Sequence, residues 1–350
     1  MEQINSRIHK KASPPATNIG IVMLILVTIA AFFSSCTDDD DDDDLVGNWT
    51  KSSDFEGVAR NEGVSFVIDN FAFVGTGYDG KKQLKDFWKY DSEKKYWTQI
   101  ADLPGSARYS AVGFGIGNRG YVGTGYDGEA YLKDFWEYNP DANEWVQKEN
   151  FAGTARYGAA SFSLDSKGFI GTGYDGNYLK DLWEYNPSTG KWTQMVSLGG
   201  TKRRDASTFV IDGKAYICAG VNNGSLVDDF WRYDPQSGSW EELRKISNYS
   251  DDSYDDDYST IVRSNAVGFA SVDKGYLALG TASSLLSNVW EYNPGTDVWE
   301  EKTAFEGTVR DGAVSFTVNN RIFITTGRSG GYQLDDMWEF KPLETYDDKN

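Results

Sequence analysis

Six arginines recur along the chain, and each is followed seventeen residues later by a glycine. They are Arg60, Arg108, Arg156, Arg203, Arg263 and Arg310. A guanidinium group can bind a carboxylate through two parallel hydrogen bonds, so a ring of six arginines is suited to holding an acidic ligand. The alternative is an internal ion pair, because an aspartate recurs two residues before a tryptophan in five copies. Recurrence in every copy favours this pairing, since a ligand rarely needs all six arginines.

The fifth copy breaks the acidic pattern. The recurring aspartates are Asp86, Asp134, Asp181, Asp229 and Asp336. Asn288 stands at the corresponding position of the fifth copy. The sequence therefore predicts that Arg263 lacks a carboxylate partner, and this makes it the strongest candidate among the six for direct ligand binding.

Tyrosines form a second candidate binding set. Tyr78, Tyr126 and Tyr174 each follow the repeat glycine in a Tyr-Asp-Gly loop that is confined to the first three copies, and Tyr109 and Tyr157 stand beside two of the arginines. Aromatic rings beside polar groups are suited to stacking on sugar faces while the polar groups bind hydroxyls. The alternative is that the three copies share the loop through duplication and that the tyrosines pack between loops.

Short strands must position these side chains. In the first unit, alternation and turn residues predict strands at residues 64–68, 71–74, 86–90 and 96–100. No stretch after residue 44 has convincing helical periodicity. A single four-stranded sheet cannot cover both of its apolar faces, but six sheets arranged radially can. The predicted fold class is therefore all-β, with six four-stranded antiparallel sheets.

Each unit resembles the kelch repeat. The resemblance rests on a small residue before glycine, as in Thr76-Gly77, then Trp88 two residues before Tyr90, then a second tryptophan, Trp97. It implies a six-bladed propeller of the galactose oxidase and kelch type over residues 45–343, followed by a tail at 344–350. It also implies that the arginine and tyrosine loops open on one face, which is commonly the ligand-binding face of such propellers.

One tryptophan lies outside the repeats. The sixth unit lacks the second tryptophan, whereas Trp49 precedes the first unit. The segment around Trp49 resembles the fourth strand of the third unit, which contains Trp192. We therefore expect an N-terminal strand to complete the last blade and close the ring, which removes an exposed sheet edge.

The N-terminal segment carries targeting signals. Residues 1–35 combine basic residues with an apolar run that is too short to span a membrane, which is typical of a signal peptide. The junction before Cys36 resembles a bacterial lipobox, so Cys36 is the predicted lipidation site and membrane anchor. Residues 36–44 then form an acidic linker that resembles the export signals of Bacteroidetes-type surface lipoproteins. We expect an outer-membrane protein facing the exterior; the alternatives are an ordinary signal peptide or the periplasmic face.

Composition excludes several functions. Removing residues 1–35 takes away three basic residues and one acid, so the formal charge changes from −19 to −21, which disfavours nucleic acid. The one histidine, His9, lies in the predicted signal peptide. Copper oxidase chemistry and the usual histidine-ligated metal sites are therefore excluded, and we expect no cofactor and no metal. Cys218 lies in an apolar run and is predicted to be a buried thiol.

An acidic insertion at residues 247–260 lengthens the connection into the fifth unit. It contains five aspartates within seven positions but lacks the glycine and the terminal glutamate of a recognised calcium loop. A mobile acidic lid or a disordered segment is favoured over a calcium site.

Three functions remain open. The first is a monomeric, membrane-anchored binding or protein-interaction module whose ligand is a glycan or a peptide. The second is a carbohydrate-active enzyme, because some kelch propellers isomerise sialic acid with arginine and acidic residues; the sequence assigns no catalytic residue. The third is a structural surface lipoprotein. A free arginine beside a deep acidic channel would favour the enzyme, and exposed tyrosines on a shallow face would favour binding.

Overall fold

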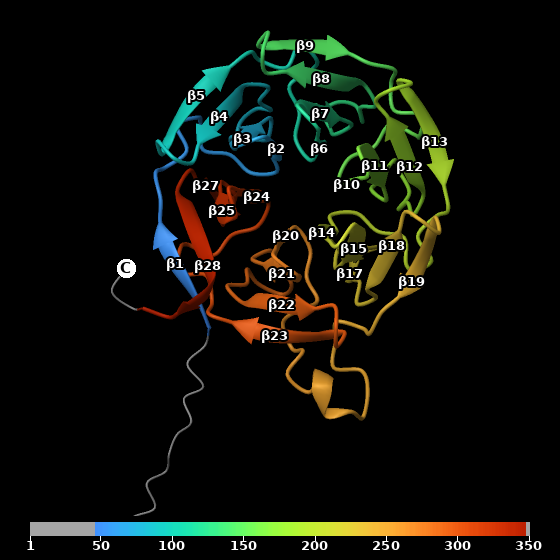
Figure 1. Ribbon diagram of the computed structural model, residues 1–350, viewed down its shortest axis with the longest axis vertical. Coiled ribbons are helices and arrows are strands. Elements are labelled where there is room, and N and C mark those ends of the chain that lie inside the picture. Colours follow the sequence, from blue (N-terminus) through green and yellow to red (C-terminus); the bar gives the residue numbers. More distant parts are fainter. Residues whose placement is uncertain (1–45, 348–350) are drawn as a thin grey trace, which may run out of the picture. The chain divides into compact units, whose positions relative to one another are not determined.

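The computed structural model describes residues 46–347. They form six four-stranded antiparallel sheets placed radially around one axis (Figure 1). The predicted six-bladed all-β propeller is confirmed. The described part of the chain holds one short 3-10 turn, η1 (Ser253–Asp255), and no helix long and apolar enough to cross a membrane. The predicted signal peptide, Cys36 and the acidic linker lie outside the described residues.

In the first three blades the strands follow chain order from the axis to the rim. Blade one contains β2 (Val64–Ile68), β3 (Phe71–Gly75), β4 (Phe87–Asp91) and β5 (Tyr96–Ile100). Blade two contains β6 (Val112–Ile116), β7 (Arg119–Gly123), β8 (Phe135–Asn139) and β9 (Glu144–Gln147). Blade three contains β10 (Ala160–Leu164), β11 (Lys167–Gly171), β12 (Leu182–Asn186) and β13 (Lys191–Met195).

The last three blades share this plan, with small additions. Blade four contains β14 (Ser207–Ile211), β15 (Lys214–Cys218), β18 (Trp231–Asp234) and β19 (Ser239–Glu242). Blade five contains β20 (Val267–Ser271), β21 (Lys274–Ala278), β22 (Val289–Asn293) and β23 (Val298–Lys302). Blade six contains β24 (Val314–Val318), β25 (Arg321–Thr325), β28 (Met337–Thr345) and β1 (Val46–Lys51). Two loop hairpins add β16 (Val221–Asn222), β17 (Ser225–Leu226), β26 (Arg328–Ser329) and β27 (Tyr332–Gln333).

Aromatic side chains fill the space between neighbouring blades. Between blades one and two, Tyr138 lies 5.6 Å from Phe73 and Trp145 lies 4.8 Å from Phe87, measured between ring centroids. All four side chains are buried. An aromatic side chain removes about 150 to 250 Å² from water when it is buried. Blade packing therefore explains why the tyrosine and the second tryptophan recur. Cys218 is likewise buried, as predicted, and burial raises the pKa of its thiol to about 12.

The N-terminal strand closes the ring. β1 pairs with β28, and Trp49 lies opposite Phe340 in the register. The Trp49 ring is fully buried, stacks on Phe340 at 4.5 Å and meets Phe305 edge-on at 4.8 Å. The predicted role of Trp49 is confirmed: it supplies the outer strand of blade six with the tryptophan that the sixth unit lacks. β28 continues to Thr345, so pairing extends past residue 343, where the sequence-predicted propeller ends.

The repeat glycine joins each blade to the next. The backbone N–H of Gly77 donates to the Arg108 carbonyl at 2.7 Å, and the bond recurs around the ring until Gly327 donates to the Arg60 carbonyl. Gly77 has a φ of +100°, and a Cβ there would lie 2.8 Å from the Asn61 carbonyl oxygen. The constant arginine-to-glycine spacing therefore follows from a backbone contact that admits no side chain.

Candidate functional site

Two loop types lie together on one face of the propeller. In every blade the residue after the arginine forms an isolated β-bridge with the residue after the glycine. The bridged pairs are Asn61 and Tyr78, Tyr109 and Tyr126, Tyr157 and Tyr174, Arg204 and Val221, Ser264 and Thr281, and Asp311 and Arg328. The structure thus brings together the two loop types that the kelch resemblance implies for one face. We call this surface the loop face.

The six recurring arginines lie beneath this face, and all are completely buried. Four of them make bidentate ion pairs with the aspartate before the tryptophan, with nitrogen to oxygen distances from 2.5 to 2.8 Å. These pairs are Arg60 with Asp86, Arg108 with Asp134, Arg156 with Asp181, and Arg310 with Asp336. Arg203 contacts Asp229 through one oxygen. Direct ligand binding by these arginines would require breaking the pairs.

Arg263 has no carboxylate partner among the described residues, as its position beside Asn288 led us to expect. It is nevertheless not free. Its Nη1 donates to the Leu279 carbonyl at 2.8 Å and to the Asn288 carbonyl at 3.0 Å, and Nη2 donates to the Thr260 carbonyl. Burial lowers its pKa to about 10. Because backbone carbonyls occupy the guanidinium group, the missing aspartate does not expose Arg263 to a ligand.

A closed ring of hydrogen bonds surrounds the axis at the loop face. It is formed by the residues two positions after the repeat arginines, each in a left-handed conformation with φ between 49° and 62°. Each backbone N–H donates to the carbonyl of the corresponding residue in the preceding blade, at distances from 2.7 to 3.2 Å. The six residues are Glu62, Ser110, Gly158, Asp205, Asn265 and Gly312. This backbone ring holds the Cα atoms of the six residues in place around the opening of the central channel.

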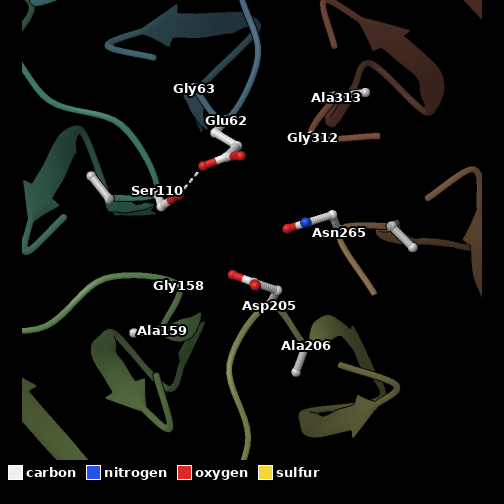
Figure 2. A pocket seen from close by; sticks show the side chains of 12 residues that line it. Glu62, Gly63, Ser110, Gly158, Ala159, Asp205, Ala206, Asn265, Gly312 and Ala313 are labelled. Carbon is white, nitrogen blue, oxygen red and sulfur yellow. Dashed lines mark hydrogen bonds between the residues drawn. The ribbon is translucent and has the colours of Figure 1, made fainter. Parts of the chain in front are cut away.

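The same six positions, with the small residue that follows each, line a cavity of about 120 Å³ that we call the axial mouth. Figure 2 shows Glu62, Asp205 and Asn265 extending toward its centre, with Ser110 beside Glu62. The Ser110 hydroxyl donates to Glu62 Oε2. Four polar side chains from different blades therefore converge at one point on the axis.

The charge of the axial mouth is unequally compensated. The Asp205 side chain is 5% exposed, and Arg204 Nη1 lies 2.7 Å from its Oδ2. Burial raises the pKa of Asp205 to about 7; Arg204 opposes this rise, and the charges of Glu62 and Asp311 add to it. Asp311 pairs with Arg328, whose Nη2 lies 3.0 Å from Asp311 Oδ2. When all three carboxyl groups at and beside the mouth are ionised, which for Asp205 requires a pH above about 7, they exceed the two guanidinium groups by one negative charge.

Seven tyrosines form a continuous surface over blades one to three, which we call the tyrosine arc. Successive ring centroids lie between 5.0 and 6.1 Å apart. The members are Tyr78, Tyr109, Tyr126, Tyr131, Tyr157, Tyr174 and Tyr178, and each is partly exposed. The structure therefore brings together the three predicted tyrosines, in contact with one another through rings from the adjoining loops. Each ring contacts other rings of the arc and keeps part of its surface exposed to solvent.

The arc adjoins the axial mouth. Burial raises the pKa of Tyr109 to about 12, and the charge of Glu62 contributes to this shift. Burial also raises the pKa of Tyr157, where Arg204 opposes and Asp205 reinforces the effect. The Arg204 guanidinium lies 5.3 Å from the centre of the Tyr157 ring. Aromatic rings and carboxylates thus form one surface from the axis outward.

Sequence reasoning did not single out the mouth residues or two members of the arc, Tyr131 and Tyr178. A signal was present, because the position two residues after each arginine varies among acid, amide, hydroxyl and glycine, whereas the arginine before it and the small residue after it recur. Variable positions between constant ones can mark a site that all copies share. The converging geometry becomes visible only when six blades are assembled.

The acidic insertion lies at the rim rather than over the axis. Figure 1 shows it projecting outward beside β23. Tyr258 is buried, and its hydroxyl accepts a hydrogen bond from the Trp299 backbone at 2.5 Å. Asp255 is buried and accepts hydrogen bonds from the backbone of Tyr249 and Ser250. The Tyr258 contact anchors the segment to blade five and the Asp255 contacts hold the insertion in shape, so the insertion does not form the expected lid over the axis. Residues 46–347 contain no cluster of histidine, cysteine or acidic residues that could hold a metal.

Comparison with known proteins identifies kelch repeats in this chain. Residues 51–202 match the KLHDC2/KLHL20/DRC7 Kelch-repeats domain, and residues 202–246 match the Kelch motif. The solved structure of YjhT superimposes with a TM-score of 0.68 at 18% identity, covering 82% of this chain and 95% of that chain. No curated protein matches. At this identity the structural likeness shows the fold alone.

Proposed function

The chain is a six-bladed β-propeller built from kelch repeats, and from this premise we propose that it is a glycan-binding module anchored to a membrane. The single observation that carries the proposal is the tyrosine arc on the loop face. Partly exposed tyrosines can stack on the flat faces of sugar rings, and their hydroxyls and the nearby aspartates can bind sugar hydroxyls. Seven connected rings provide room for several sugar units of one chain.

The loop face also has the polar groups that orient a sugar. Asp79, Asp127 and Asp175 follow three of the tyrosines; Asp79 and Asp127 each accept two hydrogen bonds from backbone N–H groups of their own loop, and Asp175 accepts one. These bonds hold the loops in shape before any ligand arrives. Preformed loops lose less conformational freedom on binding, which favours affinity. The three loops therefore present Tyr78, Tyr126 and Tyr174 from a preformed backbone.

The alternatives are less well supported by the site. The enzyme alternative called for a free arginine beside the channel, whereas all six repeat arginines are buried and bonded. Duplication of the first three copies would account for the shared loop, but tyrosines that only pack between loops would not need the solvent exposure that all seven rings retain. Anchoring through Cys36 at the outer membrane, facing the exterior, remains part of the proposal and rests on the sequence of residues 1–44.

Binding to arrayed glycans tests the proposal. We expect the protein to bind a defined group of glycans, and Tyr131→Ala and Tyr174→Ala each to weaken that binding about tenfold through lost stacking. Tyr249→Ala is the matched control, because Tyr249 is 69% exposed and lies on the insertion at the rim. Absence of binding to every glycan, or equal loss in the control, would contradict a glycan-binding arc.

A further inference from the structure

We propose that the axial mouth binds a primary ammonium group between Glu62 and Asp205, and that the ligand is therefore a glycan containing amino sugars with free amines. This inference rests on the proposed glycan-binding function and specifies its ligand. Neither the kelch matches nor the repeat pattern assigns a role to these two residues, since the corresponding positions in the other blades are serine, glycine or asparagine.

Asp205 has unused capacity to accept hydrogen bonds. Its side chain is 5% exposed, and its one close partner in the described part of the chain is the Arg204 guanidinium at Oδ2. A carboxylate can accept about four hydrogen bonds, two at each oxygen. The Oδ1 atom has no hydrogen-bond donor among residues 46–347 and lies beside Gly158, another residue of the mouth. A buried carboxylate oxygen in this state favours a donor supplied by a ligand.

The remaining groups match the three N–H donors of an ammonium group. Glu62 extends into the mouth from blade one, where Ser110 and Asn61 already donate to it. The Asn265 amide points into the same space from blade five and has no hydrogen-bond partner in the described chain. Two carboxylates and an amide oxygen from three blades are therefore available to one cation.

Charge favours a cation over an anion. Arg204 pairs with Asp205 and Arg328 with Asp311, so the Glu62 carboxylate has no cationic partner at the mouth within residues 46–347. Burial raises the pKa of Asp205 to about 7, with Glu62 and Asp311 adding to the effect and Arg204 opposing it. An arriving ammonium group would offset the repulsion between the carboxylates. An anion would add to it, and the repeat arginines that could have compensated are occupied.

The tyrosine arc distinguishes an amino sugar from a metal ion. Tyr109 and Tyr157 adjoin Glu62 and Asp205, so a sugar bearing the ammonium group would meet aromatic rings as soon as it leaves the axis. Aromatic faces also attract cations directly. The cavity holds no group of three ligands suited to a metal within residues 46–347. Rings next to carboxylates are what a stacked amino sugar requires.

Two probes that differ only at nitrogen test the inference. The full-length protein in detergent micelles is titrated by calorimetry with the β-1,4-linked hexamer of glucosamine and with the hexamer of N-acetylglucosamine. We expect the free-amine hexamer to bind more tightly by about tenfold or more. Glu62→Gln and Asp205→Asn should each remove most of that difference, because they keep the shape of the side chain but not its charge.

A matched control separates the mouth from the general negative charge of the protein. Asp212 lies in the exposed turn between β14 and β15 of the same blade as Asp205, at the opposite end of the sheet. Asp212→Asn removes the same charge and should leave both affinities unchanged. Far-ultraviolet circular dichroism and retained binding of the acetylated hexamer show whether Glu62→Gln and Asp205→Asn still fold.

The possible outcomes separate this inference from the proposed function. Equal affinity for the two hexamers, lost in Tyr174→Ala, would overturn the ammonium site and leave glycan binding intact. A preference for the free amine that persists in Glu62→Gln and Asp205→Asn would also overturn it. If neither hexamer binds, the amino-sugar assignment is wrong, and the glycan array alone decides whether the arc binds other sugars.

Discussion

Arg60 and Asp86 form a bidentate ion pair in which Nη1 lies 2.8 Å from Oδ1 and Nη2 lies 2.7 Å from Oδ2. The Trp88 indole donates to the same Oδ2 at 2.8 Å, and Arg60 Nη1 also donates to the Thr76 carbonyl at 2.9 Å. One buried guanidinium group therefore ties the loop before β2 to the end of β3 and the start of β4. The recurrence of this arginine follows from how a blade is held together.

Replacing Arg60 should be strongly destabilising. Arg60→Met leaves the Asp86 carboxylate without its partner, and we expect the free energy of unfolding to fall by about 3 to 5 kcal/mol. Denaturant titration followed by tryptophan fluorescence measures the change. The control is Arg119→Met, because Arg119 hydrogen-bonds only to the carbonyl of Asn118 among the described residues. A loss no larger than that of the control would show that the pair contributes little.

Acid should weaken the same ion pairs. Burial alone would raise the pKa of Asp86, but the hydrogen bonds and the charge of Arg60 have the larger combined effect and lower that pKa from its ordinary value. The pKa values of Asp134 and Asp336 are lowered in the same way by their arginine partners. A carboxyl group with a lowered pKa stabilises the fold fully above its unfolded pKa, and this contribution is lost as pH falls through the folded pKa. We therefore expect the stabilisation from these pairs to begin to fall below about pH 4 and to be lost progressively as the pH drops further.

A triple variant isolates that contribution. Asp86→Asn, Asp134→Asn and Asp336→Asn combined should melt below the wild type at pH 7, and the difference in melting temperature should narrow as the pH falls below about 4. Thermal melts at a series of pH values measure it. A difference that stays constant across this range would mean that the aspartates do not titrate with lowered pKa values.

The parts predicted from sequence are those that every blade repeats. The first and fourth strands of blade one match their predicted bounds, and β3 and β4 differ by one residue, because Asp69 and Asn70 mark the turn clearly. Ring closure by Trp49 was predictable because a missing residue in the last unit had a counterpart at the start. A local sequence pattern is enough to predict features that depend on one blade, such as strand bounds, or on two neighbouring blades, such as ring closure.

The axial mouth could not be predicted in the same way. Glu62 and Asp205 are far apart in sequence and converge only because six left-handed residues form a hydrogen-bonded ring. The environment of Arg263 could be predicted only in part. Its lack of an aspartate was predictable, but the carbonyls that replace the aspartate come from the local backbone path, which the side-chain pattern does not specify.

The repeat glycines offer a test of the contact between blades. Gly77→Ala places a Cβ 2.8 Å from the Asn61 carbonyl oxygen at a φ of +100°. We expect a loss of stability of about 2 kcal/mol or more, because backbone atoms must move. Gly213→Ala is the matched control, since its φ is +69° and nothing lies within 4 Å of the added Cβ. It should cost about 1 kcal/mol. Equal losses would contradict a steric role for Gly77.

Lipidation is tested at Cys36. Cys36→Ser removes the thiol that would carry the lipid, so the protein should move from the membrane fraction to the soluble fraction. Immunoblots of fractionated cells measure this distribution. Cys218→Ser is the control for loss of a thiol, because Cys218 is buried in the propeller. Continued membrane association of Cys36→Ser would overturn the lipoprotein assignment.

Ring closure is tested at Trp49. Trp49→Ala removes a fully buried ring that contacts Phe305 and Phe340, and its indole nitrogen no longer donates to the Thr303 carbonyl at 3.3 Å. We expect a loss of about 3 to 5 kcal/mol, which is typical of truncating a buried tryptophan. Denaturant titration measures it, with Val46→Ala as the control because Val46 is 41% exposed on the same strand. The loosened β1 should also expose the edge of β28 and promote association at higher protein concentration. If Trp49→Ala were as stable as Val46→Ala and remained monomeric in size-exclusion chromatography, the N-terminal strand would not be what closes the ring.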